Sequence, residues 1–295
     1  MPTDNDARFG RIGIWSSALH PSEPADLAAV SAAVTELDAL GYGTIWMGGS
    51  PSLDQVVPVL EATRHITVAT GILSIWDHPA PAVAERTARI RRDSAGRFVL
   101  GLGVSHQGFN PNYARPYSAM VEYLDALDAA ADPVPASGRV LAALGPKMLK
   151  LAADRAWGAH PYLVTAEHTA QARAALGPDA LLAPELTVVL DTDLDQARTV
   201  ARGMLAMYLQ LPNYTDNLLR LGFTERDFAD GGSDRLLAAL FALGDAATVR
   251  DRVDEYLAAG ADHLALQVLT GERASALPLT QWRTLAEALE LTPRG

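Results

Sequence analysis

The chain has 295 residues, 49% of them hydrophobic and 20% charged, so it can bury a large core in one domain or in two smaller ones. Its net charge of −11 argues against general nucleic-acid binding, and the lack of cysteine excludes disulfides, thiolate catalysis and cysteine metal sites. No apolar run is long enough to cross a membrane and residues 1–10 do not resemble a signal peptide, so we expect a cytoplasmic protein.

Strand and helix candidates alternate along the chain. Several strand candidates are near-continuous apolar runs, as expected of parallel strands that are buried on both faces. The predicted strands are Arg11–Trp15, Thr44–Met47, Thr67–Leu73, Phe98–Val104, Val140–Ala143, Ala159–Val164, Leu186–Leu190 and His263–Val268. The predicted helices are Pro24–Leu40, Pro81–Ser94, Pro116–Ala130, Lys147–Trp157, Leu194–Tyr208 and Ala246–Ala259.

About eight strand–helix units in this length predict a (β/α)8 TIM barrel, with residues 1–295 as a single α/β domain. Two of the predicted helices end at Gly41 and Gly260, each followed at once by a strand. A doubly wound open sheet is the alternative, but the Gly-x-Gly-x-x-Gly turn expected after its first strand is missing. The segment Gln210–Leu243 is predicted to be a largely helical insertion before the last strand, where it would shape the substrate entrance.

The only two lysines, Lys147 and Lys150, lie in one predicted helix directly after Gly145-Pro146. Proline suits the first helical position because the N–H there has no partner within the helix. The turn leaves backbone N–H groups and the positive end of the helix dipole directed at one point beside Lys147. This arrangement is typical of an anion seat; the alternative is an ordinary strand-to-helix turn with solvated lysines.

Aromatic residues follow the first three predicted strands. Chemistry in a (β/α)8 barrel lies at the C-terminal ends of the strands. Trp15, Trp46 and Trp76 are therefore predicted to form an aromatic wall of a substrate pocket, suited to a flat ring system, although each could instead cap the barrel core. Asn213 and Tyr214, from the insertion, are predicted to line the same pocket.

Three histidines are candidates for acid–base catalysis, but the sequence assigns no catalytic residue. His106 and Ser105 directly follow the glycine-containing strand Phe98–Val104, and we expect both to contact a ligand. His20 and His78 follow the first and third strands and are plausible pocket residues.

The remaining histidines are not site candidates. His65 and His263 belong to the far end of the predicted barrel and are expected to be structural, whereas His160 begins a strand and His168 lies in a helix. No metal site is expected, because the first strand lacks the His-x-His of barrel metallohydrolases.

Five stretches together carry a resemblance to a known family. They are Gly96–His106, Arg115–Tyr117 with Tyr123–Leu127, Ala142–Met148, Tyr208–Tyr214 and Ala259–His263. In this order they resemble the luciferase-like monooxygenase superfamily, and within it the actinobacterial branch that uses coenzyme F420, an 8-hydroxy-5-deazaflavin. The resemblance implies a (β/α)8 barrel, commonly a homodimer, with the cofactor at the C-terminal mouth.

The resemblance also implies where the cofactor lies. Gly145, Pro146 and Lys147 are expected to hold its phosphate-bearing tail, in agreement with the anion seat. Gly71-Ile72 matches the place where relatives carry a non-proline cis peptide behind the cofactor ring.

One departure from the family pattern bears on the reaction. Deazaflavin-dependent alcohol and sugar dehydrogenases carry Asp-His at the end of the second strand, where this chain has Gly48-Gly49-Ser50. The sequence thus favours an oxidoreductase that passes a hydride between the deazaflavin C5 and an unidentified small organic substrate. Reduction of an activated double bond or imine fits better than alcohol oxidation. Two alternatives stay open: an FMN-dependent monooxygenase with a separate flavin reductase, and a flavin-binding protein without turnover.

Overall fold

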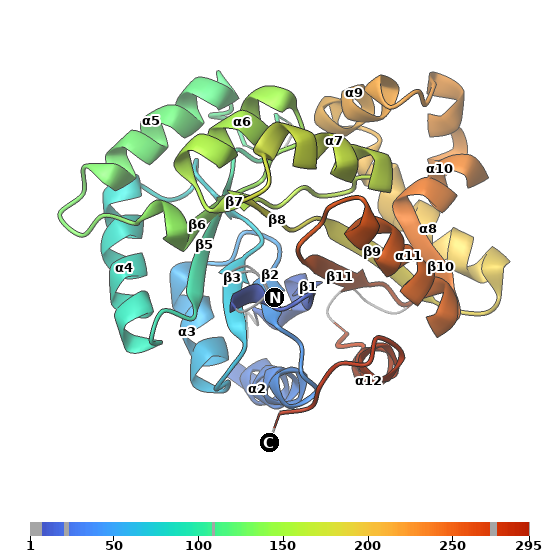
Figure 1. The fold of residues 1–295 in the computed structure, drawn as a ribbon, viewed down its shortest axis with the longest axis horizontal. Helices are drawn as coiled ribbons and strands as arrows, with labels where there is room; N and C mark the ends of the chain where they lie inside the picture. Colours follow the sequence, from blue (N-terminus) through green and yellow to red (C-terminus); the bar gives the residue numbers. More distant parts are fainter. Residues whose placement is uncertain (1–7, 21–23, 108–109, 272–275, 295) are drawn as a thin grey trace.

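The computed structural model describes residues 8–20, 24–107, 110–271 and 276–294. Its strands run parallel and are surrounded by helices, which confirms the predicted TIM-barrel-like α/β fold (Figure 1). Within these residues, no helix has the length and apolar character required to cross a membrane.

The strands fill the centre of the molecule and the helices its outside (Figure 1). The strands are β1 (Ile12–Ser16), β2 (Thr44–Met47), β3 (Thr67–Thr70), β4 (Leu73–Ser74), β5 (Phe98–Gly103), β6 (Arg139–Leu141), β7 (Gly158–Ala159), β8 (Leu181–Leu182), β9 (Glu185–Leu190), β10 (Phe241–Gly244) and β11 (Leu264–Val268). The α-helices are α2 (Pro24–Ala39), α3 (Leu53–Glu61), α4 (Ala80–Asp93), α5 (Pro116–Asp128), α6 (Pro146–Arg155), α7 (Ala166–Leu176), α8 (Leu194–Tyr208), α9 (Pro212–Arg220), α10 (Asp234–Leu240), α11 (Ala246–Ala258) and α12 (Leu279–Ala288).

The barrel closes through a strand that is interrupted in its middle. Only Ala183 and Pro184 separate β8 from β9. On one side β8 pairs with β7, and on the other β9 pairs with β11, which in turn pairs with β1. The order then runs through β2, β3, β5 and β6 back to β7, so the ring of parallel strands is complete.

Several segments differ from the sequence prediction; among them, strand β8 and helix α12 were not predicted. The predicted strand Ala159–Val164 pairs only at Gly158–Ala159, because Pro161 has no N–H to donate to a ladder. The insertion is helical in α9, a 3-10 stretch at Glu225–Gly231 and α10, but its end forms strand β10, which pairs with β9. Helix α3 was not predicted; it carries Pro58 in its interior, where proline normally breaks a helix.

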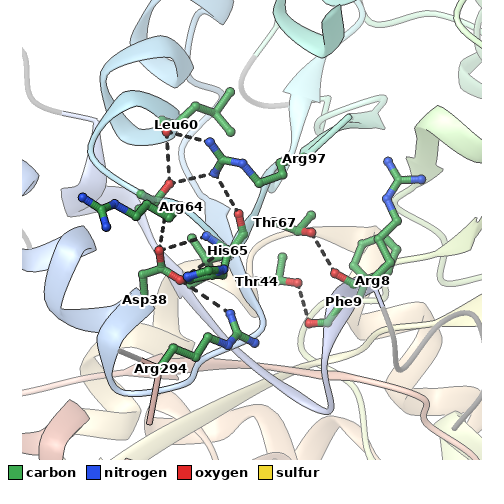
Figure 2. A network of polar contacts seen from close by, with 12 residues as sticks. Arg8, Phe9, Asp38, Thr44, Leu60, Arg64, His65, Thr67, Arg97 and Arg294 are labelled. Carbon is green, nitrogen blue, oxygen red and sulfur yellow. Dashed lines mark hydrogen bonds and ion pairs between the residues drawn. The ribbon is translucent and has the colours of Figure 1, made fainter. Parts of the chain in front are cut away.

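A polar network ties down the loop that precedes β3 (Figure 2). Asp38, in the last turn of α2, accepts the backbone N–H groups of Arg64 and His65 at its Oδ2, at 2.6 and 3.0 Å. Arg97 reaches over the same loop and donates to the carbonyl of Leu60 at 2.9 Å. These contacts lie at the N-terminal ends of the strands, so they stabilise the barrel and leave its opposite end for a site.

Candidate functional site

A cavity of about 710 Å³ opens at the C-terminal ends of the barrel strands. Its lining residues follow β1, β2, β3, β5, β6 and β7 or come from α5, α6, α8 and α9. This is the size of a site for a small molecule or cofactor, and its position is the one at which barrel enzymes carry their chemistry.

One side of the cavity, the glycine wall, follows the neighbouring strands β3, β5 and β6. We define it as Gly71, Ile72, Gly103, Ser105, His106, Gly145, Pro146 and Lys147. The Gly71–Ile72 peptide is cis, as the sequence predicted. All the residues predicted to contact a cofactor lie in this wall, so the structure brings that set together around one cavity.

The glycines of β5 allow two strand backbones to approach each other closely. A Cβ on Gly101 would lie 1.9 Å from the carbonyl oxygen of Thr70, and a Cβ on Gly103 would lie 2.6 Å from the Ile72 side chain. The Thr70 Oγ1 also donates to the Gly101 carbonyl at 2.7 Å and accepts its N–H at 2.8 Å. The neighbour that leaves no room for a side chain at Gly101 is therefore the backbone of the adjacent strand β3.

The turn into α6 has the features of the predicted anion seat. Gly145 is the N-cap of α6 and provides no capping side chain, and a Cβ placed on it would meet no atom within 4 Å. Lys147 lines the cavity beside it, at the exposed rim. Lys150 points elsewhere: its side chain is 74% exposed and pairs with Asp154 at 3.0 Å. The two lysines thus differ in what they can bind.

A second side of the cavity is the tyrosine wall, defined as Trp15, Tyr162, Tyr208 and Tyr214. The ring centroids of Trp15 and Tyr162 are 5.4 Å apart, those of Tyr162 and Tyr208 also 5.4 Å, and those of Tyr208 and Tyr214 5.2 Å. Burial raises the pKa of all three tyrosines, so the phenols stay neutral. Trp15 and Tyr214 were predicted as pocket residues; Tyr162 and Tyr208 were not.

The floor of the cavity is formed by His160, which the sequence analysis had set aside. The His160 Nδ1 lies 2.6 Å from the carbonyl oxygen of Ala183 and so carries the proton. Its Nε2 is buried and has no hydrogen-bond partner among the described residues. Burial lowers the pKa of His160 to about 4, which keeps the ring neutral.

Trp46 lies beneath this floor, which corrects its prediction as a pocket residue. Its indole is fully buried, stacks on His160 with ring centroids 4.1 Å apart, and donates to the His263 Nε2 at 3.0 Å. It fills the barrel interior and does not line the cavity.

Trp76 also lies outside the cavity lining, because its indole turns toward the backbone. Its Nε1 donates to the Val104 carbonyl, and its ring lies 5.9 Å from that of Tyr113, which does line the cavity. Trp76 therefore supports a lining residue, in place of the predicted direct contact.

Of the three histidines proposed for acid–base chemistry, only His106 lines the cavity. His20 packs against Gly49, with its Nε2 3.0 Å from the position of a Cβ there, and the glycine lines the cavity in its place. His78 lies beyond the end of β4 and is not a lining residue; its carbonyl accepts the Tyr123 hydroxyl.

His106 links the glycine wall to the insertion. Its Nδ1 lies 3.2 Å from the Asn213 Nδ2, and its ring is 5.1 Å from that of Tyr214. Asn213 lines the cavity, as predicted. Burial lowers the pKa of His106, so the ring is neutral near pH 7 and can bind or exchange a proton.

Trp15 packs against Gly48 at the end of β2. A Cβ on Gly48 would lie 2.3 Å from the Trp15 ring, so a side chain there would collide with the indole. The Trp15 Nε1 donates to the Gly71 carbonyl at 2.8 Å and thereby connects the two walls. Among the described residues, no group of three or more His, Asp or Glu could hold a metal ion.

Comparison with known proteins identifies the family. The model of the luciferase-like monooxygenase family matches residues 9–263. The chain belongs to this family. Among curated proteins, 4-hydroxyprotoasukamycin monooxygenase of Streptomyces nodosus subsp. asukaensis is 34% identical over 77 residues, which cover 23% of this chain and 20% of that protein. The matched stretch thus spans only a fifth of the relative.

Solved structures of the same fold bind either of two cofactors. An F420-dependent secondary alcohol dehydrogenase in complex with an F420–acetone adduct has a TM-score of 0.71 and 14% identity, covering 95% of this chain and 98% of the other. A coenzyme F420-dependent tetrahydromethanopterin reductase from Methanopyrus kandleri has a TM-score of 0.69 and 17% identity, and the match covers 95% of this chain and 97% of the other. The oxygenating constituent of 3,6-diketocamphane monooxygenase from Pseudomonas putida, in complex with FMN, has a TM-score of 0.67 and 13% identity, and the match covers 95% of this chain and 97% of the other. Proteins of this fold therefore include both F420-dependent and FMN-binding enzymes.

Proposed function

We propose that this luciferase-like protein is a coenzyme F420-dependent oxidoreductase that passes a hydride between the deazaflavin C5 and a small organic substrate. The observation that carries the proposal is the position of Lys147 beside the uncapped start of α6, in the same cavity as Gly71 and Ile72. A cofactor with a flat ring and an anionic tail would meet both features at once.

The residues of the cavity fit such a cofactor. Its walls are apolar and aromatic, and Gly145 leaves open space at the start of α6. Lys147 is the only lysine, arginine or carboxylate residue among the described residues that line the cavity. A phosphodiester carries one negative charge, whereas the terminal phosphate of FMN carries nearly two at neutral pH. One lysine beside the start of α6 therefore matches the charge of a phosphodiester better than that of the FMN phosphate.

When bound, the deazaflavin supplies a hydride at C5 and lacks the N5 that supports oxygen chemistry. The chain then has to bind and orient the cofactor and the substrate, and to exclude water. In our proposal Lys147 and the α6 N-terminus bind the tail, Gly71 and Ile72 support the ring, and Ser105 and His106 contact it from β5. With Trp15 in the place of the second-strand histidine, reduction of an activated double bond or imine fits better than alcohol oxidation.

An FMN-dependent monooxygenase is the second candidate, because the stretch of 34% identity belongs to a protein named a monooxygenase. It would need reduced flavin from a separate reductase. The resemblance also implies a homodimer, which light scattering of the purified protein would test.

Titration of the purified protein with F420 and with FMN tests the proposal. We expect F420 to bind at least about tenfold more tightly, and the reduced complex to transfer its hydride to activated enones or imines without consuming oxygen. Tighter FMN binding with oxygen consumption by the reduced complex would favour the monooxygenase. Tight binding of either cofactor without turnover on a broad substrate panel would favour a binding protein.

A further inference from the structure

The tyrosine wall presents ring faces and edges to the cavity from several directions. Tyr208 and Tyr214 meet edge to face, with an interplanar angle of 88°, and Trp15 and Tyr162 are inclined by 48°. Such inclined rings form a concave surface that can contact an aromatic ligand on its face and on its edge. A flat aliphatic or strongly hydrated ligand would gain less from this surface.

The tyrosine wall is also free of formal charge. None of the four residues that form it carries a charge, because the phenols stay neutral. The carboxyl nearest in the barrel interior is Glu185, which is 1% exposed and does not line the cavity. Its oxygens accept hydrogen bonds from the Thr187 hydroxyl and the Leu163 N–H. Burial of a ligand carboxylate here would leave its charge without a counterion.

A chain of hydrogen bonds links the polar groups of the tyrosine wall. Tyr208 donates its hydroxyl proton to the Tyr162 oxygen at 3.0 Å, and Tyr162 donates to the Gln267 Oε1 at 2.6 Å. Gln267 is part of β11, so the chain is anchored in the barrel. Tyr208 is half-buried and lines the cavity, and its oxygen keeps lone-pair capacity for a further partner. A ligand hydroxyl is the partner that this oxygen fits.

We propose that the tyrosine wall is the substrate subsite and that it selects a neutral aromatic molecule bearing a hydroxyl group, which hydrogen-bonds to Tyr208. That the occupant is the hydride-exchanging substrate rests on the function proposed above. The two walls then divide the cavity: the glycine wall holds the anionic cofactor, and the tyrosine wall holds the uncharged substrate.

Calorimetry on the full chain without added cofactor tests the subsite independently of cofactor identity. The probes share one ring system: 2-naphthol, naphthalene and 2-naphthoate, all at neutral pH. Binding is measured with the Lys147→Ala variant, because Lys147 lines the same cavity and would pair with the carboxylate. We expect 2-naphthol to bind at least about tenfold more tightly than 2-naphthoate, because the carboxylate then finds no partner. Equal or tighter binding of the carboxylate would overturn the proposal.

Two variants locate the hydroxyl contact. Tyr208→Phe should weaken 2-naphthol binding about fivefold and leave naphthalene binding unchanged, since it removes one hydrogen bond and no ring. Tyr117→Phe is the matched control, because Tyr117 also lines the cavity but is 43% exposed and belongs to neither wall; it should leave both affinities unchanged. Equal affinity of 2-naphthol for Tyr208→Phe and the natural protein would contradict the assignment. If Tyr208→Phe did not fold, the selectivity between 2-naphthol and 2-naphthoate would still decide.

Competition separates this proposal from the cofactor proposal. Saturating F420 should leave the affinity for 2-naphthol within about twofold, because the two ligands occupy different walls. Mutual exclusion would mean that the cofactor ring itself lies on the tyrosine wall, which would overturn the subsite while leaving cofactor binding intact. Failure of F420 to bind, with 2-naphthol selectivity preserved, would overturn only the cofactor.

Discussion

The two walls of the cavity are specified in different ways. The glycine wall consists of three short segments, at or beyond the C-terminal ends of β3, β5 and β6, and each segment is continuous or nearly continuous in sequence. The tyrosine wall gathers Trp15, Tyr162, Tyr208 and Tyr214 from β1, the loop after β7, α8 and α9. A backbone site is thus encoded locally, whereas a side-chain surface depends on the packing of distant elements.

The largest effect that we predict concerns a glycine that allows backbone contact. Gly101→Ala should destabilise the protein by about 3 kcal/mol or more, because its Cβ would lie 1.9 Å from the Thr70 carbonyl oxygen and the backbones must separate. Gly145→Ala is the control, since its Cβ meets nothing within 4 Å; it should cost less than about 1 kcal/mol. Urea unfolding followed by circular dichroism measures both. Similar midpoints for the two variants would show that Gly101 can relax and would contradict this account of β5.

The second prediction separates the two lysines. Lys147→Ala should weaken F420 binding about tenfold, because a charge-assisted contact at an exposed rim contributes about 1.5 kcal/mol. Lys150→Ala should change the affinity less than about twofold, since its side chain is 74% exposed and pairs with Asp154. Fluorescence titration with F420 measures the affinity of both variants, and equal unfolding midpoints would show that both keep the fold. Equal and negligible effects would remove the anion seat from the glycine wall.

The third prediction concerns pH and the buried groups beneath the tyrosine wall. Burial lowers the pKa of His160 and His263 to about 4, so between about pH 6.5 and pH 4 the unfolded chain binds their protons and the folded chain does not. Stability is therefore lost as the pH falls. Burial raises the pKa of Glu185 to about 7, so in an overlapping window the folded chain keeps a proton that the unfolded chain releases, which opposes the histidines.

For these three groups, two histidines against one carboxyl contribute a net loss of stability of about 1.4 kcal/mol per pH unit between about pH 6 and pH 5. The lowered pKa of His106 and of His168 adds to this loss. Glu185→Gln removes the opposing group and should steepen the slope by about 1.4 kcal/mol per pH unit. Urea unfolding at a series of pH values measures it, in a range above that in which surface carboxylates titrate. An unchanged slope in Glu185→Gln would mean that Glu185 is ionised in the folded protein.

The smallest predicted effect tests the link between the walls. Trp15→Phe keeps an aromatic ring but removes the hydrogen bond from the indole Nε1 to the Gly71 carbonyl, at a cost of about 1 kcal/mol. We expect F420 affinity to fall more in this variant than in Tyr214→Phe, which lies in the same wall without contacting Gly71. Unchanged stability and affinity in Trp15→Phe would show that the two walls are held independently.

Much of the glycine wall could be predicted from the sequence. Gly145-Pro146-Lys147 and Ser105-His106 each directly follow an apolar strand, and in a parallel barrel the ends of consecutive strands must meet at one mouth. The cis Gly71–Ile72 peptide followed from the family resemblance and is present in the structure. The two strand-end segments need only local sequence and the knowledge that the sheet closes, whereas the cis peptide needs the family resemblance.

The depth of a side chain could not be predicted in the same way. Trp15 and Trp46 are register partners on neighbouring strands, yet Trp15 lines the cavity and Trp46 lies below its floor. Strands in a barrel are tilted and staggered, so paired residues lie at different heights along its axis. That stagger is a property of the closed sheet, and it cannot be predicted from the sequence of a single strand.

The sequence alone determined the alternation of parallel strands and helices, the helical insertion and the glycine turn into α6, because hydrophobic periodicity and turn chemistry act over a few residues. Only the tertiary structure decided which aromatic residues face the cavity. Tyr162 follows a strand that ends early, and Tyr208 is the last residue of a helix whose sequence resembles that of other surface helices. His160 lines the cavity because of the stagger of the barrel strands. Their meeting depends on how α8 and α9 pack across the mouth, which is a long-range property of the folded chain.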